Sequence, residues 1–164
     1  MKKIFAILLA SLGFSCSNAQ KTAFSESALN EKLLSVNDGE LYFKEILKKH
    51  SGKTVVIEFW ASWCGDCVKA MPKIKEIQEQ NPEVVYLFIS FDKTTEKWKE
   101  GMEKHELKGF HYLALDGMKG KFGSAVDLDW IPRYMVIDKS GKIVIYRAIE
   151  TDFEEIAKTI QLLK

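Results

Sequence analysis

The pattern of apolar and polar residues along the chain predicts alternating strands and helices. Two runs, 54–60 and 84–91, are rich in β-branched and aromatic residues and dense enough to predict strands that are covered on both faces. Two further strands are predicted at 134–138 and 142–147. The Asp-Lys-Ser-Gly segment 138–141 between them has the composition of a hairpin turn.

Apolar residues at helical spacing predict the other elements. Positions three and four residues apart predict helices at 43–50, 68–80, 95–105 and 153–163. Thr151 and Glu154 have the spacing of a capping box at the start of the last helix. From residue 54 onward the order is β-α-β-α-β-β-α. This order predicts one α/β domain with a mixed central sheet flanked by helices on both faces.

The first residues are typical of an export signal. Residues 1–3 (Met-Lys-Lys) are positively charged, and 4–14 is an apolar run too short to span a bilayer as a helix. Small residues at 17–19 predict a signal peptide, residues 1–19, that is removed before Gln20. A buried N-terminal helix is the structural alternative. We expect an exported protein in the bacterial periplasm.

A second processing site is also readable in this segment. Residues 12–16 resemble a loose bacterial lipobox, in which case the signal is 1–15 and Cys16 becomes a lipid anchor on a membrane. In either case residues 20–40 form a polar lead-in with one short strand, and 41–164 form the domain.

Composition narrows the class of protein. The chain has 164 residues, 46% of them hydrophobic, which suits one compact domain. The net charge is +1, so there is no basic excess for a nucleic-acid partner. Three cysteines are too few for a disulfide scaffold and suit a redox pair, since Cys16 leaves with a signal cut before Gln20.

The chemistry is predicted at Cys64-Gly65-Asp66-Cys67, between a buried strand and a helix. A helix N-terminus has unpaired N–H groups and a partial positive charge, which stabilise a thiolate at Cys64. Cys67 lies one turn further along, close enough to form a disulfide. Cys64 can then attack a target disulfide, and Cys67 can resolve the mixed disulfide.

The segment 55–72 (VVIEFWASWCGDCVKAMP) resembles the active-site segment of thioredoxins, specifically the exported TlpA/ResA-like branch. Further similarity lies at Ile131-Pro132 and at 138–143, and the resemblance covers residues 40–164. It implies a thioredoxin fold and the activity of a thiol–disulfide oxidoreductase. It also implies that Cys64 is the nucleophile and Cys67 the resolving cysteine.

The same resemblance implies a substrate groove beside the cysteines. Pro132 is expected to be cis and to face the disulfide, with the backbone of Ile131 pairing with an incoming peptide. Pro72 is expected to kink the helix. The predicted substrate-binding residues are Trp63, Gly65, Asp66, Trp130, Ile131 and Pro132.

Three residues depart from the family's pattern. Asp66 replaces the proline that is common between the cysteines, so a redox potential cannot be carried over. Ala70 stands where some cytochrome-maturation members have a glutamate, which weakens that specific role. Trp130 stands where a small residue is common, and it either walls the groove or packs.

Glu58 is the third predicted catalytic residue. It lies six residues before Cys64, where thioredoxins have a buried acid, and it interrupts an otherwise apolar strand. Desolvation there is expected to raise its pKa, so that it can take the proton of Cys67 during resolution. The alternative is a strand-end glutamate that reaches solvent.

No metal or cofactor is predicted. A metal site would need Cys64 and Cys67 together with two of the histidines His50, His105 and His111. The gap from Cys67 to His105 is outside zinc-finger spacing. Val68 occupies the position where haem attachment requires histidine. Trp98 is expected to be a core anchor rather than a cofactor contact.

The function expected from these residues is that of an exported enzyme, most simply a monomer, that reduces disulfides in extracytoplasmic proteins. Its partners are a protein or peptide with a thiol or disulfide and a membrane electron donor. The alternative is a non-catalytic thioredoxin-fold module that binds peptides and has a structural disulfide.

Overall fold

The computed structural model describes residues 20–37 and 39–164, so the predicted signal peptide and Cys16 lie outside the described residues. Seven strands form one sheet, in the spatial order β2-β1-β5-β4-β3-β6-β7. Their bounds are β1 Lys32–Ser35, β2 Gly39–Tyr42, β3 Val55–Trp60, β4 Val85–Ser90, β5 Phe110–Leu113, β6 Arg133–Ile137 and β7 Ile143–Ala148.

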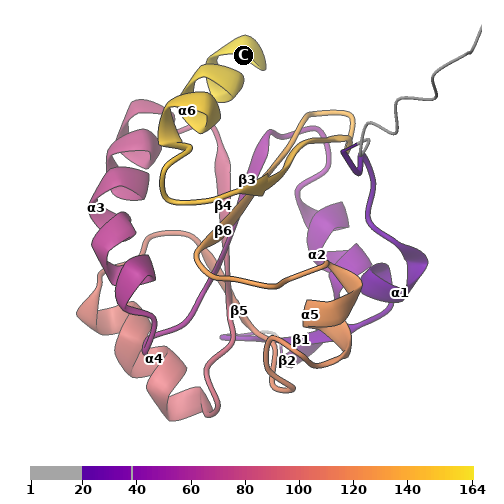
Figure 1. Cartoon of the computed structure of the whole chain (residues 1–164). Helices are drawn as coiled ribbons and strands as arrows, with labels where there is room; N and C mark the ends of the chain where they lie inside the picture. The colour runs from indigo at the N-terminus through magenta and orange to yellow at the C-terminus, as the bar shows by residue number, and fades with distance from the viewer. Residues whose placement is uncertain (1–19, 38) are drawn as a thin grey trace, which may run out of the picture.

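Six helices cover the two faces of this sheet (Figure 1). Their bounds are α1 Glu26–Leu29, α2 Phe43–Lys49, α3 Gly65–Gln80, α4 Thr95–Lys104, α5 Lys121–Ala125 and α6 Phe153–Leu162. Helices α3, α4 and α6 lie on one side, and α1, α2 and α5 lie on the other (Figure 1). Phe43 of α2 packs edge-on against Phe122 of α5, with ring centroids 5.1 Å apart. The predicted α/β class, a mixed sheet with helices on both faces, is confirmed.

The central strands form the core. β3 pairs in parallel with β4 and antiparallel with β6, and every residue of β3 and β6 is buried. Such strands need apolar side chains on both faces, which explains why 54–60 is apolar apart from Thr54 and Glu58. Trp98 of α4 is fully buried, which confirms the prediction that its side chain anchors the core.

The segment before residue 41 holds more structure than the one predicted strand. It contains α1 and a hairpin of β1 and β2, and β1 joins the main sheet through β5. Each of these elements is four residues long, as is β5, and such short elements are too brief for a hydrophobic period to be recognised.

The predicted capping box of the last helix is wrong. The N-cap is Asp152, one position later than Thr151, so Glu154 falls one position too early in the helix to complete a box. The Asp152 carboxylate instead accepts a hydrogen bond from the Ile149 N–H at 2.9 Å. The Asp152 side chain therefore stabilises the turn before α6 and does not cap the helix.

The start of the chain follows the outer strand of the sheet. The N–H of Ile143 donates to the Thr22 carbonyl at 2.9 Å, and the Gln20 side chain donates to the Val144 carbonyl. Residues 20–22 thus cover part of the β7 edge. Among the described helices, none is both long enough and apolar enough to cross a membrane.

Candidate active site

A disulfide joins Cys64 and Cys67 where β3 gives way to α3. Cys64 is the N-cap of α3, and its Sγ accepts a hydrogen bond from the Cys67 N–H at 3.1 Å. The helix therefore begins one turn before the predicted start at residue 68. The two Cα atoms are 5.3 Å apart, within the ordinary range for a disulfide.

The two sulfurs differ in their access to solvent. Cys64 is 6% exposed, whereas Cys67 is fully buried against the core. The positive end of the helix dipole lies at Cys64 and favours a thiolate there when the disulfide is reduced. An incoming sulfur can therefore reach Cys64 and not Cys67.

The loop before β6 meets the disulfide from the opposite side. The Cys64 Sγ lies 3.6 Å from the carbonyl oxygen of Ile131, although the residues are 67 positions apart. The Ile131-Pro132 peptide bond is cis, as expected from the resemblance. Trp63, beside Cys64, and Trp130, beside Ile131, are 59% and 57% exposed. The disulfide is thus flanked by two large apolar side chains in water.

Glu58 lies in β3, beneath this surface. It is 2% exposed, and its Oε1 accepts a hydrogen bond from the Tyr134 hydroxyl at 3.4 Å. Its Oε2 has no hydrogen-bond partner among the described residues. Burial raises the pKa of Glu58 to about 8, against a smaller opposing effect of the Tyr134 hydrogen bond. The structure therefore has the buried acid that was predicted, and not a strand-end glutamate in solvent.

Gly65 and Asp66 occupy the exposed first turn of α3. The space around the Gly65 Cα is open, so no neighbour requires glycine there. The Asp66 carboxylate forms an ion pair with the Lys69 ammonium at 3.2 Å, one turn further along the helix. This pairing partly neutralises the charge that Asp66 places near Cys64.

Asp92, which was not predicted, holds the loop before Cys64. It follows β4 and is 1% exposed. Its carboxylate accepts hydrogen bonds from the Ser62 N–H at 3.1 Å, the Ser62 hydroxyl at 2.7 Å and the Ser90 hydroxyl at 2.8 Å. An aspartate directly after a buried strand, at the same sheet edge as the cysteines, was the available signal.

Helix α4 packs closely against the same loop. A Cβ atom added at Gly101 would lie 2.8 Å from the Ser62 Cβ and 3.1 Å from the Trp60 ring. Only glycine therefore allows α4 to lie this close to the loop. The loop is fixed by hydrogen bonds to Asp92 and by close packing against Gly101.

An ion-pair network supports the loop before β6. The Asp129 carboxylate pairs with both Arg133 and Arg147. Arg133, which follows Pro132 directly, is only 4% exposed. Asp129 therefore links the segment that carries Trp130 to both β6 and β7.

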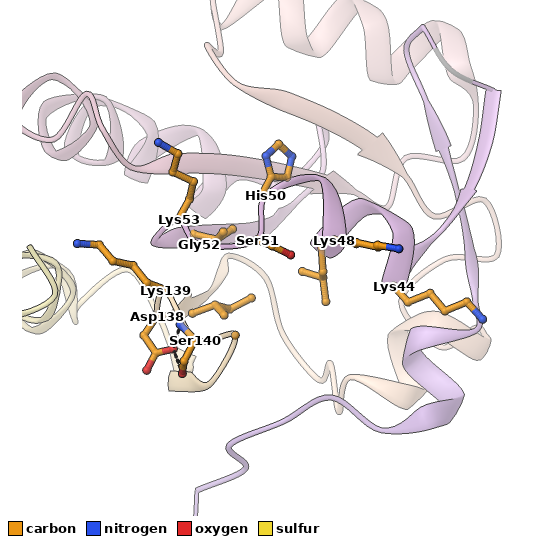
Figure 2. Close-up of a pocket in the computed structure, with 13 residues that line it drawn as sticks. Lys44, Lys48, His50, Ser51, Gly52, Lys53, Asp138, Lys139 and Ser140 are labelled. Carbon is orange, nitrogen blue, oxygen red and sulfur yellow. Dashed lines mark hydrogen bonds between the residues drawn. The ribbon is translucent and has the colours of Figure 1, made fainter.

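A hollow lies at the other end of the strands, where Val55 of β3 pairs with Ile137 of β6 (Figure 2). Its volume is about 220 Å³, and Lys44, Lys48 and Lys53 line it together with the turn after β6. In that turn the Asp138 carboxylate is occupied by the Ser140 N–H and hydroxyl (Figure 2). None of the predicted site residues lines this hollow.

His50 and His111 each pack against an aromatic ring. His50 packs against Phe110, with ring centroids 4.4 Å apart, and His111 stacks on Phe88 at 5.1 Å. Burial lowers the pKa of both imidazoles. Among residues 20–37 and 39–164, no three His, Cys, Asp or Glu side chains are grouped closely enough to hold a metal ion.

Comparisons with known proteins agree with this site. A sequence model described as thioredoxin-like matches residues 52–143. The chain is 27% identical over 144 residues to the thiol-disulfide oxidoreductase ResA of Bacillus thuringiensis subsp. konkukian, which covers 86% of this chain and 82% of that protein.

Two solved structures have the same fold. A Bacteroides vulgatus protein assigned as a thiol-disulfide oxidoreductase is 26% identical, with a TM-score of 0.68, covering 89% of this chain and 100% of that one. A secreted disulfide oxidoreductase of Mycobacterium tuberculosis is 16% identical, with a TM-score of 0.63, covering 85% and 100%.

Fold, cysteine pair and relatives define the class as thiol–disulfide oxidoreductase. The chain belongs to the thioredoxin-like family. The matched residues include β3, the disulfide and the loop before β6, so the resemblance noted in the sequence is confirmed.

We expect limiting iodoacetamide to alkylate Cys64 and to leave Cys67 nearly unmodified in the reduced protein. Only Cys64 reaches the surface and the helix N-terminus. Peptide mass spectrometry gives the ratio of the two products. Labelling that favours Cys67 would reverse the assignment of the two sulfurs.

We expect Asp92→Asn to lower the free energy of unfolding by about 1–3 kcal/mol, because an amide NH₂ would face the donors of Ser62 and Ser90. Asp138→Asn is the matched control. Its carboxylate also accepts several hydrogen bonds, but it is only partly buried and lies at the other end of the sheet. Urea denaturation measures both variants, and equal losses would contradict a special role for Asp92.

Proposed function

We propose that the protein reduces disulfides in proteins of an extracytoplasmic compartment, with Cys64 as nucleophile and Cys67 as resolving cysteine. The observation that carries this proposal is the asymmetry of the pair. Cys64 alone is accessible, at the N-terminus of a helix, while its partner is buried one turn away. A disulfide with only a structural role gains nothing from a first cysteine that keeps slight access to solvent while its partner is fully buried.

The reaction begins with the protein as the dithiol. The Cys64 thiolate attacks one sulfur of the substrate disulfide, and the other substrate sulfur leaves as a thiolate that takes up a proton. The Cys67 thiol then loses its proton, and its sulfur attacks Cys64. The bond between Cys64 and the substrate breaks, the second substrate thiol is released, and the Cys64–Cys67 disulfide forms.

Glu58 is proposed as the acceptor of the Cys67 proton. A general base works best when its pKa is close to the working pH, and burial moves the pKa of Glu58 to about 8. Among the described residues its Oε2 has no hydrogen-bond partner, so the carboxylate has a free acceptor. After resolution the proton passes from Glu58 to solvent.

The substrate is proposed to bind across the disulfide. The exposed rings of Trp63 and Trp130 offer apolar contact. The backbone of Ile131, whose carbonyl oxygen lies 3.6 Å from the Cys64 Sγ, is proposed to pair with an extended peptide. Gly65 and Asp66, in the open first turn of α3, are proposed to contact the same peptide. The proposed partners are therefore proteins or peptides with a disulfide near apolar residues.

Export and re-reduction are part of the proposal. The charged and apolar start of the chain supports a signal peptide of residues 1–19, or of 1–15 with lipid on Cys16. The M. tuberculosis relative with this fold is secreted. A membrane electron donor with a dithiol is proposed to return the disulfide to the dithiol. Because residues 20–22 cover the β7 edge, we propose a monomer.

We expect the wild-type protein to catalyse the reduction of insulin by dithiothreitol, and Cys64→Ala to lose this activity on the order of 10²-fold. Cys67→Ala should form a stable mixed disulfide with an insulin chain, because the intramolecular attack is missing. Cys64→Ala, the matched control, should form none. A non-catalytic binding module predicts no insulin reduction by the wild type and equal, non-covalent capture by both variants.

We expect the full chain, expressed in a Gram-negative host, to be recovered from the periplasm with Gln20 as its first residue, as measured by intact mass. Cys16→Ser should then behave identically. A lipid mass on Cys16, lost in Cys16→Ser, would select the lipoprotein signal instead. Recovery of residues 1–19 uncut in the cytoplasm would contradict export.

A further inference from the structure

Within the described part of the chain, the Glu58 carboxylate has one hydrogen-bond partner, Tyr134. The two residues are directly opposite in the β3–β6 register, so their side chains extend from the same face of the sheet. Tyr134 is fully buried, and its hydroxyl donates to the Glu58 Oε1 at 3.4 Å. The second carboxylate oxygen, Oε2, has no partner among the described residues.

The other groups around this pair are apolar or lie further away. Phe88 of β4 is the register partner of Glu58 on its other side, and Phe153 of α6 packs against the Tyr134 ring at 5.2 Å. Helix α3, whose buried residues include Cys67, lies on the same side of the sheet as α6 (Figure 1). Burial raises the pKa of Tyr134, and the charges of Glu58 and, to a smaller extent, of Glu150 in the turn between β7 and α6 raise it further. The pKa of Glu58 depends on burial and on Tyr134, with no contribution from a Lys or Arg.

We propose that Tyr134 is the positioning residue of the resolution step: its hydroxyl holds Oε1 of Glu58 and leaves Oε2 as the atom that takes the Cys67 proton. This inference rests on the proposed role of Glu58. Tyr134 acts on the reaction through the Glu58 carboxylate, to which its hydroxyl donates. No Lys or Arg of the described residues contributes to the pKa of Glu58, so Tyr134 is the group that stabilises its ionised form.

The sign of the effect follows from the direction of the hydrogen bond. The hydroxyl donates to the carboxylate, so it favours the ionised form and lowers the pKa of Glu58 from what burial alone would give. Tyr134→Phe removes this donor. The carboxylate should then form only at higher pH, and the pH midpoint of resolution should rise by about one unit. At pH 7 the rate should fall by up to about tenfold.

The experiment follows one turnover of resolution in the full chain. The probe is a mixed disulfide of Cys64 with 2-nitro-5-thiobenzoate, whose release by Cys67 is read by absorbance as a function of pH. Tyr86→Phe is the matched control. Tyr86 is also buried, and its hydroxyl donates at 3.3 Å to the Ile77 carbonyl, which does not titrate. We expect the profile to move upward in Tyr134→Phe and to stay in place in Tyr86→Phe.

Glu58→Gln separates this inference from the proposed function. If Glu58 is the acceptor, Glu58→Gln slows resolution, and adding Tyr134→Phe to it moves the profile no further. A slow Glu58→Gln with an unmoved Tyr134→Phe overturns the inference and leaves the role of Glu58 intact. An unaffected Glu58→Gln overturns that role itself. Should Tyr134→Phe fail to fold, carbon NMR of the wild type decides: the Tyr134 ring signals must follow the titration of the Glu58 carboxyl, and their independence refutes the inference.

Discussion

The burial of β3 on both faces is the constraint on which the rest of the structure depends. All six of its residues are inside the core, between β4 and β6. Its end is therefore a fixed point, and Cys64 follows four residues later as the N-cap of α3. The same burial encloses Glu58, which would be an ordinary solvated carboxylate on an edge strand. One strand thus places both the nucleophile and the acid beneath it.

Enclosing Glu58 has a cost in stability. Its pKa is about 8 in the folded protein and near the ordinary value in the unfolded chain, so the folded state holds its proton more tightly. The contribution of Glu58 to stability is therefore full below its unfolded pKa and is lost as the pH rises through the folded value. The protein retains an acid that opposes folding at neutral pH, which is typical of groups kept for chemistry.

Different interactions hold the two loops that form the site. The loop before Cys64 is fixed by the buried Asp92 and by α4, which approaches closely only because position 101 is glycine. The loop before β6 depends on ion pairs of Asp129 with Arg133 and Arg147. These contacts hold both loops in place, while Trp63 and Trp130 stay exposed. The apolar surface that the two rings form therefore keeps a constant position relative to the disulfide.

The sequence by itself determined the central strands, the long helices and the cysteine pair, because each follows from a local pattern or spacing. The cis proline at Pro132 was predicted from the resemblance to the family. The position of Glu58 inside an apolar strand could also be recognised from the local sequence. The structure agrees with the predicted burial, since Glu58 is 2% exposed. Only the tertiary structure decided that Tyr134 bonds Glu58, that Asp92 bonds Ser62, and that α4 touches the active-site loop. These contacts join residues on different strands and helices, and no period along the chain encodes which side chains will meet when the strands pair.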